Sequence, residues 1–256
     1  MGRRMIDRTG ERFTTNEGYE IVIIEYNSAL DVTIQFQDKY KAILEHRQYA
    51  DCRKGLIKNP YCKNVYGQGF IGQGKYKSSI NKKETDEYRE WYNIMIRGFD
   101  EEFKKKNPTY KDVIVDERFY CFQDYGCWRE HNYYEIEGEK MQLDKDILFK
   151  GNKIYSPDTC IFVPQRINLL FTKSDVVRGN YPIGVSYHKP TNKYVVYCKT
   201  LYNNKYLGLY NTPEEGFQAY KTFKEAYIKE VADSYKDRIP QELYKAMYNW
   251  KIEVDD

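Results

Sequence analysis

The chain has 256 residues, of which 41% are hydrophobic and 31% are charged, and its mean hydropathy is −0.82. This length and polarity favour several small modules over one large core, and no apolar run is long enough to span a membrane. The net charge of +3 excludes a polybasic coat, so a nucleic-acid surface must come from local clusters of basic residues.

The sequence holds six cysteines and no C-x-x-C pair, which argues against a zinc ribbon. No signal peptide is recognisable ahead of them. We therefore expect reduced cysteines and a cytoplasmic protein.

The first 80 residues are predicted to be rich in β-structure. Two stretches, "YEIVIIEY" (19–26) and "DVTIQF" (31–36), combine β-branched and aromatic residues and are joined by the turn "NSAL". A compact barrel-like or SH3-like module is the expected outcome.

The stretch "NVYGQGFIGQGKYKSS" (64–79) contains the pattern G-x-G-x-x-G. A dinucleotide-binding fold requires a buried strand before these glycines and a helix after them. Here a turn with Pro60 precedes them and a polar stretch follows, so we expect no nucleotide cofactor. A glycine-rich hairpin or loop is the simplest interpretation. The flanking lysines, which include Lys75 and Lys77, leave a contact to a nucleic-acid backbone open.

Residues 85–99 change to a helical period, with Thr85 as the expected N-cap. Arg97 lies on the polar side of this helix and is our candidate for a phosphate contact. A second helix is predicted over about residues 117–130. The apolar face of the first helix is predicted to consist of Tyr88, Trp91, Tyr92, Met95, Ile96 and Phe99.

Residues 139–172 are predicted to form strand, loop, strand and helix. "KMQLDKDILF" is followed by the turn "KGNKIYSPDT", by the apolar run "CIFV" and by "PQRINLLF". Pro164 marks the expected helix start, which puts Asn168 about one turn inside the helix.

Residues 182–236 are predicted to form three short strands and a long helix. Thr212, Pro213 and Glu215 supply an N-cap, a first-turn proline and a capping box. The buried stripe of this helix is predicted to consist of Ala219, Phe223, Ala226 and Tyr227.

The residues Asp144, Asn152, Pro157 and Asn168, in this order and in a strand–loop–strand–helix context, resemble the HNH (His-Me finger) nucleases of the phage homing type. The resemblance implies that Asp144 and Asn168 hold one Mg²⁺ or Mn²⁺ ion and that Asn152 braces the hairpin. It also implies a phosphodiester hydrolase, in the host cytoplasm if a phage encodes it. The simpler alternative is that the carboxylates are exposed strand residues and Asn152 is a turn residue.

The chain departs from this family at Lys145, which occupies the place of the histidine that activates water. A lysine with an ordinary pKa of about 10.4 is protonated near neutral pH and cannot accept a proton. Lys145 would therefore need a pKa lowered by burial or a cationic neighbour, or it would hold a phosphate instead. Asp146 is predicted to share a strand face with Asp144 and is a possible substitute base or ligand.

The stretch "GVSYHK…KYVVYC…YLGLYNTPEEGFQAY" resembles the plant-type APETALA/ethylene-response-factor DNA-binding module. The resemblance implies a three-stranded sheet that enters the major groove of double-stranded DNA. A small α/β cap with a solvated sheet is the alternative. Across the chain, the candidate DNA-binding residues are Lys75, Lys77, Arg97, Lys153, Arg166, Tyr187, His188, Lys189, Lys193, Tyr197, Lys199 and Lys205.

Together these features predict an α+β fold of several small modules in series. The expected modules are an SH3-like β module (1–80), an HNH-like ββα-metal unit with a helical lead-in (81–175), and a three-stranded sheet with a helix (176–256). We expect a DNA-binding, metal-dependent endonuclease with Asp144, Lys145, Asp146 and Asn152 at its site. The alternative is a decayed nuclease fold that binds DNA or inhibits a host protein.

Overall fold

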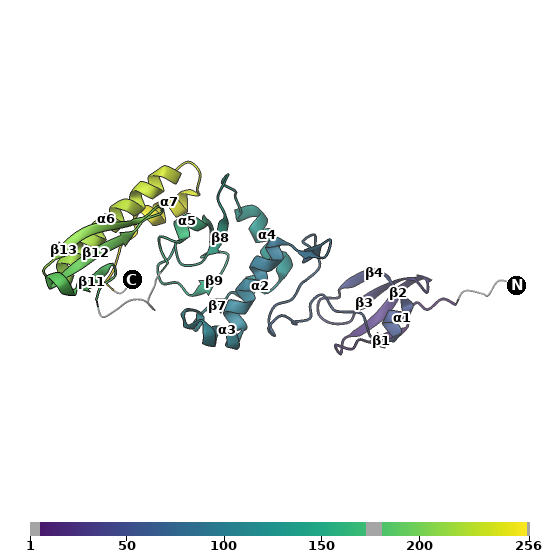
Figure 1. The fold of residues 1–256 in the computed structure, drawn as a ribbon. Helices are drawn as coiled ribbons and strands as arrows, with labels where there is room; N and C mark the ends of the chain where they lie inside the picture. The colour runs from purple at the N-terminus through teal and green to yellow at the C-terminus, as the bar shows by residue number, and fades with distance from the viewer. Residues whose placement is uncertain (1–5, 173–180, 255–256) are drawn as a thin grey trace. The chain divides into compact units, whose positions relative to one another are not determined.

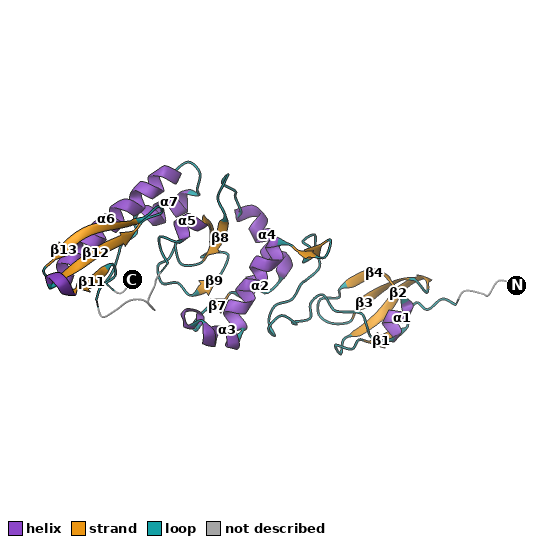
Figure 2. Ribbon diagram, viewed as in Figure 1, coloured by secondary structure: helices purple, strands orange, loops and turns teal. Residues whose placement is uncertain are grey.

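A computed structural model of the chain describes residues 6–172 and 181–254 (Figure 1). Helices and several small sheets follow one another along the chain, which confirms the α+β prediction (Figure 2). Packing divides the chain into two compact units, Met1–Glu130 and His131–Asp256. The predicted boundary at 80/81 lies inside the first unit, and the boundary at 175/176 lies outside the described residues. The division into three modules stays a prediction.

The first unit begins with an antiparallel sheet of four strands in chain order. Alternate residues of its two central strands, such as Ile21, Ile23 and Ile34, are fully buried, as expected for strands with one face on a core. The sheet ends earlier than the predicted module, because a glycine-rich segment follows it. The elements are β1 (Arg12–Thr14), β2 (Glu20–Ser28), β3 (Asp31–Phe36), β4 (Ile43–Arg47) and the helix α1 (Tyr49–Arg53).

The rest of the first unit is mainly helical. Thr85 caps α2 as predicted, since its hydroxyl accepts the N–H of Tyr88 at 3.3 Å. Trp91 and Met95 are buried as predicted, but Ile94 replaces Ile96 in the core. The elements are β5 (Ser79–Ile80), β6 (Lys83–Glu84), α2 (Asp86–Phe99), α3 (Glu101–Lys106), η1 (Pro108–Tyr110), β7 (Ile114–Val115), η2 (Glu117–Phe119) and α4 (Phe122–Asn132).

The helix predicted over about residues 117–130 is split in two. Phe70 interrupts it, because its N–H donates to the carbonyl of Tyr120 at 3.0 Å and its carbonyl accepts the N–H of Phe122 at 2.9 Å. A Cβ on Gly72, whose φ is +74°, would lie 2.7 Å from the sulfur of Cys121 and 3.2 Å from the side chain of Gln123 in α4. The glycine run is therefore a loop that packs closely on α4, as the simplest interpretation predicted.

The second unit begins with the strand–loop–strand–helix order predicted from the sequence. β8 (Met141–Asp144) pairs antiparallel with β10 (Ile161–Pro164), and Asp144 lies opposite Ile161. The loop between them contains β9 (Ile154–Tyr155). The helix α5 (Gln165–Asn168) begins directly after Pro164.

The predicted three-stranded sheet and long helix follow. Thr212 caps α6, accepting the N–H of Glu215 at 3.2 Å. The last helix, α7, was not predicted from the sequence. The elements are β11 (Val185–His188), η4 (Lys189–Thr191), β12 (Lys193–Lys199), β13 (Asn204–Tyr210), α6 (Pro213–Tyr235) and α7 (Gln241–Tyr248).

The predicted buried stripe of α6 is only partly right, because Phe223 and Tyr227 pack against the core but Ala226 is exposed. The helix approaches the sheet most closely at Gly216, where a Cβ would lie 2.9 Å from Val196. That contact turns residues at intervals of four, such as Tyr220 and Ile228, toward the core.

The ββα segment and the C-terminal sheet share one hydrophobic core. Val163 and Ile167 belong to the same buried cluster as Val196, Ile228 and Met247. The second unit is therefore packed as a whole, although the sequence predicted two separate modules within it.

Candidate metal centre and nucleic-acid interface

Asp144 ends β8 and anchors the turn that follows. Its Oδ1 accepts the N–H groups of Asp146 at 2.8 Å and Ile147 at 2.7 Å. Burial raises the pKa of Asp144 to about 6, and the nearby Asp146 carboxylate adds to the effect. Asp144 is therefore a largely desolvated carboxylate whose pKa lies closer to neutral pH than that of an ordinary aspartate.

Asp146 does not share a strand face with Asp144, contrary to the prediction. β8 ends at Asp144, and Asp146 lies in the turn beyond it. The turn, rather than strand alternation, brings the two carboxylates together, because the Asp144 oxygen captures the N–H of Asp146. The proximity of Asp144 and Asp146 was predicted from strand alternation, which does not apply beyond the end of β8.

Lys145 is buried, with only 8% of its surface exposed. Its Nζ donates to Asp146 Oδ2 at 3.0 Å and to the carbonyl of Asn152 at 3.2 Å. It also lies 5.8 Å from the ring centroid of Tyr155. Both hydrogen bonds use the amine as a donor, whereas a general base must accept a proton.

Asn152 fastens the loop between β8 and β9. Its Nδ2 donates to the carbonyls of Lys145 at 2.6 Å and Ile154 at 2.8 Å. Its Oδ1 accepts the N–H of Ile154 at 3.2 Å. These bonds give Asn152 the geometry of a brace, which is the part that the resemblance implied for it.

Asn168 reaches the face of β8 that carries Asp144. Its Nδ2 donates to Gln142 Oε1 at 3.1 Å, and Gln142 shares a strand face with Asp144 because they are two residues apart. No direct hydrogen bond joins Asn168 to Asp144 in the part of the chain that the structure describes. Gln142 was missed from the sequence, and only its alternation with Asp144 could have indicated it.

The donors at this site suit a hard divalent cation. Two carboxylates and an amide oxygen, from Asp144, Asp146 and Asn168, are the ligand types that Mg²⁺ and Mn²⁺ prefer. Within residues 6–172 and 181–254, no group of three or more His, Cys, Asp or Glu side chains could hold a metal ion. A metal here would therefore depend on the amide oxygen. The neighbouring Cys160 is a poor ligand, since burial raises its thiol pKa to about 12.

The C-terminal sheet turns one face to α6 and the other outward. Val185, Val196 and Cys198 are buried against the helix side. By alternation, and by the register of the strands, the outward face carries four of the predicted DNA-binding residues: His188, Lys193, Tyr197 and Lys199.

Three other candidates of this sheet do not lie on that outward face. Tyr187 shares the inner face with Val185; its ring packs 5.6 Å from Tyr194 and its hydroxyl donates to Asn192. Lys205 lies opposite the buried Cys198, and Lys189 belongs to the turn η4. The sheet geometry therefore favours DNA contacts from the four residues on the outward face over contacts from the other three.

The remaining basic candidates have different surroundings. Lys75 donates to both carboxylate oxygens of Glu130, at 2.8 and 2.6 Å, so its charge is largely matched. Arg97 lies 5.4 Å from the ring centroid of Tyr110. Lys77 and Lys153 are exposed. Arg166 is exposed on α5, and its guanidinium lies 3.7 Å from Glu139.

Comparisons with protein-family models, with curated proteins and with solved structures gave no match. No helix among the described residues is long and apolar enough to cross a bilayer. Any function proposed for this chain therefore depends on the geometry of the chain itself.

Proposed function

We propose that the chain is a DNA-binding, HNH-like endonuclease of the phage type that hydrolyses phosphodiester bonds with one divalent metal ion. The observation that carries this proposal is Asp144, which is half-buried at the end of β8 and has a raised pKa and a neighbouring carboxylate. The helix that follows β10 brings Asn168 back to the same face of β8.

Each residue of the site has a definite part in the proposal. Asp144 and Asn168 would hold the metal ion, with Asp146 beside them. An ion held there would supply the positive charge that neutralises the scissile phosphate and the leaving oxygen. Lys145 keeps Asp146 in place as a hydrogen-bond donor, and Asp146 is the remaining carboxylate that can accept a proton from water. The outward face of the C-terminal sheet binds the duplex.

Cleavage of supercoiled plasmid in Mg²⁺ or Mn²⁺, against EDTA, tests the proposal. We expect metal-dependent nicking by the wild-type protein. Asp144→Ala should reduce the rate at least about 100-fold and leave DNA affinity within about threefold, because it removes a metal ligand and not a DNA contact. Asp237→Ala, which removes an exposed carboxylate in the turn after α6, is the matched control. Undiminished cleavage by Asp144→Ala would remove Asp144 from the mechanism.

A second candidate is a decayed nuclease fold that binds DNA, or a host protein, without cleaving. The two donor contacts of the buried Lys145 favour it, since they put a structural cation where the family has its base. DNA binding without cleavage in either metal would select this candidate. In both cases we propose a cytoplasmic protein, in the host cytoplasm if a phage encodes it.

A further inference from the structure

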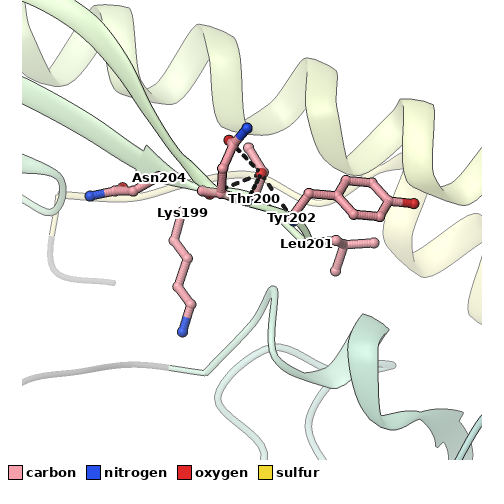
Figure 3. A pocket seen from close by; sticks show the side chains of 6 residues that line it. Lys199, Thr200, Leu201, Tyr202 and Asn204 are labelled. Carbon is pink, nitrogen blue, oxygen red and sulfur yellow. Dashed lines mark hydrogen bonds between the residues drawn. The ribbon is translucent and has the colours of Figure 1, made fainter.

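The turn between β12 and β13 is a rigid projection of the C-terminal sheet. Thr200 Oγ1 accepts the N–H groups of Tyr202 at 3.3 Å and Asn203 at 3.0 Å. The backbone N–H of Thr200 donates to the carbonyl of Asn203 at 2.8 Å. Lys199 extends away from α6 at the base of this turn, and residues 199–204 line a shallow concavity (Figure 3).

The turn is also fixed to α6. The N–H of Leu201 donates to the hydroxyl of Tyr227 at 3.0 Å, and the buried amine of Lys224 donates to the carbonyl of Lys199 at 3.5 Å. These bonds hold the turn before any ligand arrives, so a ligand bound there would not have to order it.

Tyr202 projects from this turn and contacts α5 through Arg166. Its side chain is 79% exposed, yet its ring centroid lies 5.7 Å from the guanidinium carbon of Arg166. Arg166 belongs to α5 and lies two residues before Asn168. The contact therefore joins the sheet that we propose binds DNA to the helix that carries a candidate metal ligand.

The guanidinium of Arg166 is available to an anion. Its side chain is 51% exposed, and its approach to Glu139 at 3.7 Å is too long for a hydrogen bond. Among the described residues, the Arg166 side chain makes no hydrogen bond, so its N–H donors remain available. Glu139 is itself occupied by the hydroxyl of Tyr235 at 2.6 Å and is mostly buried. The exposed charge at this point is positive.

We propose that Arg166 and Tyr202 form a phosphate-binding site that sets the position of the DNA duplex relative to the metal centre. Arg166 donates to a backbone phosphate, for which its planar fork is well suited. Tyr202 is a positioning residue that orients the guanidinium through a cation–π contact. Because α5 carries both Arg166 and Asn168, a phosphate held by Arg166 lies at a set distance from the cleavage site. This inference depends on the proposed function.

Four variants test the site by the salt dependence of duplex binding. Arg166→Gln should lower the log–log slope by about 0.9, the value for one lost phosphate contact. Tyr202→Ala should lower it in the same direction by a smaller amount, whereas Tyr202→Phe keeps the ring and should match the wild type. Tyr248→Ala is the control, since its ring has the same kind of contact, 5.2 Å from Lys229, elsewhere in the unit.

A second measurement maps the cut positions on an end-labelled duplex. Wild type, Tyr202→Phe and Tyr248→Ala should cut at the same positions, whereas Arg166→Gln and Tyr202→Ala should spread the cuts over neighbouring phosphates. If Tyr202→Ala does not fold, Arg166→Gln, which changes an exposed side chain, still decides the matter.

The outcomes separate this inference from the function on which it depends. A wild-type protein that does not bind duplex DNA would overturn both. A wild-type protein that binds DNA, with the same salt slope in Arg166→Gln, would overturn this inference alone. Binding without cleavage, with the lowered slope in Arg166→Gln, would keep the phosphate site and overturn the endonuclease.

Discussion

The partly desolvated carboxylate of Asp144 lowers the stability of the protein near neutral pH. Its folded pKa of about 6 lies above the ordinary value of 3.8, so the folded state binds the proton more tightly than the unfolded state. The contribution of Asp144 to stability is therefore greatest at or below pH 3.8 and falls as the pH rises through about 6.

Asp144→Asn tests this charge directly. The amide keeps an oxygen for the N–H groups of Asp146 and Ile147 but cannot ionise. We expect the variant to raise the free energy of unfolding near neutral pH by about 1–3 kcal/mol, with the gain lost near pH 4. Urea unfolding at both pH values measures it, with the exposed Asp237→Asn as control. A gain of the same size at both pH values would contradict the expectation.

Lys145 is predicted to be a structural cation. Lys145→Met keeps the length of the side chain but leaves the Asp146 carboxylate and the Asn152 carbonyl without their donor. We expect a loss of about 1–3 kcal/mol in the free energy of unfolding. Lys153→Met, in the same loop and exposed, should change it by less than about 0.5 kcal/mol. Similar losses in the two variants would show that the buried contacts contribute little.

The kinetic role of Lys145 can be tested separately, if the wild-type protein cleaves. A lysine base would give a cleavage rate that rises far into the alkaline range, and Lys145→Met would remove that rise. With Lys145 as a donor, the wild-type rate should show no such rise, and Lys145→His should increase the rate near neutral pH. A cleavage rate that rises at alkaline pH in the wild type, but not in Lys145→Met, would contradict the assignment of Lys145 as a structural cation.

Among the elements, the glycine loop can be tested against its own internal control. Gly67 and Gly72 have similar φ values, +71° and +74°, but only Gly72 lies against Cys121. We expect Gly67→Ala to lower the free energy of unfolding by about 1 kcal/mol, because alanine would have to adopt the left-handed backbone conformation. Gly72→Ala should cost at least about 1 kcal/mol more, because α4 or the loop must move. Equal melting temperatures for the two variants would contradict close packing of the loop on α4.

Local sequence patterns predicted most of the helices and strands. The features that they did not predict depend on packing between residues that are distant in the sequence. Buried and exposed residues alternate along the strands of the C-terminal sheet, and Thr212 and Glu215 mark the start of α6. Both the strands and the helix could therefore be predicted. The complete buried face of α6 was not, because it depends on the close approach of Gly216 to Val196, which is distant in the sequence. At the candidate site, the sequence predicted the types of residue. It could not predict the hydrogen bonds of Lys145 to Asn152 and of Asn168 to Gln142, because the loop and the sheet bring these residues together.

At the scale of the second unit, the shared core has a consequence for any study of DNA binding. Removing the C-terminal sheet would also remove the partners of Val163 and Ile167, so the ββα segment would lose its core. Loss of DNA binding in such a truncated protein would then report unfolding and not a missing DNA contact. Charge changes on the outward face, such as Lys193→Gln and Lys199→Gln, are the better test.

The shared core itself can be tested with Met247 in α7, which is fully buried in the same cluster as Val163 and Ile167. Met247→Ala should lower the free energy of unfolding by about 2–5 kcal/mol. Because one core holds both segments, amide hydrogen exchange should accelerate in β8 and β10 as well as in β12 and α6. An exposed change on the same helix, Gln241→Ala, should leave both unaltered. Faster exchange confined to the C-terminal sheet and its helices would show two independent modules, as the sequence alone predicted.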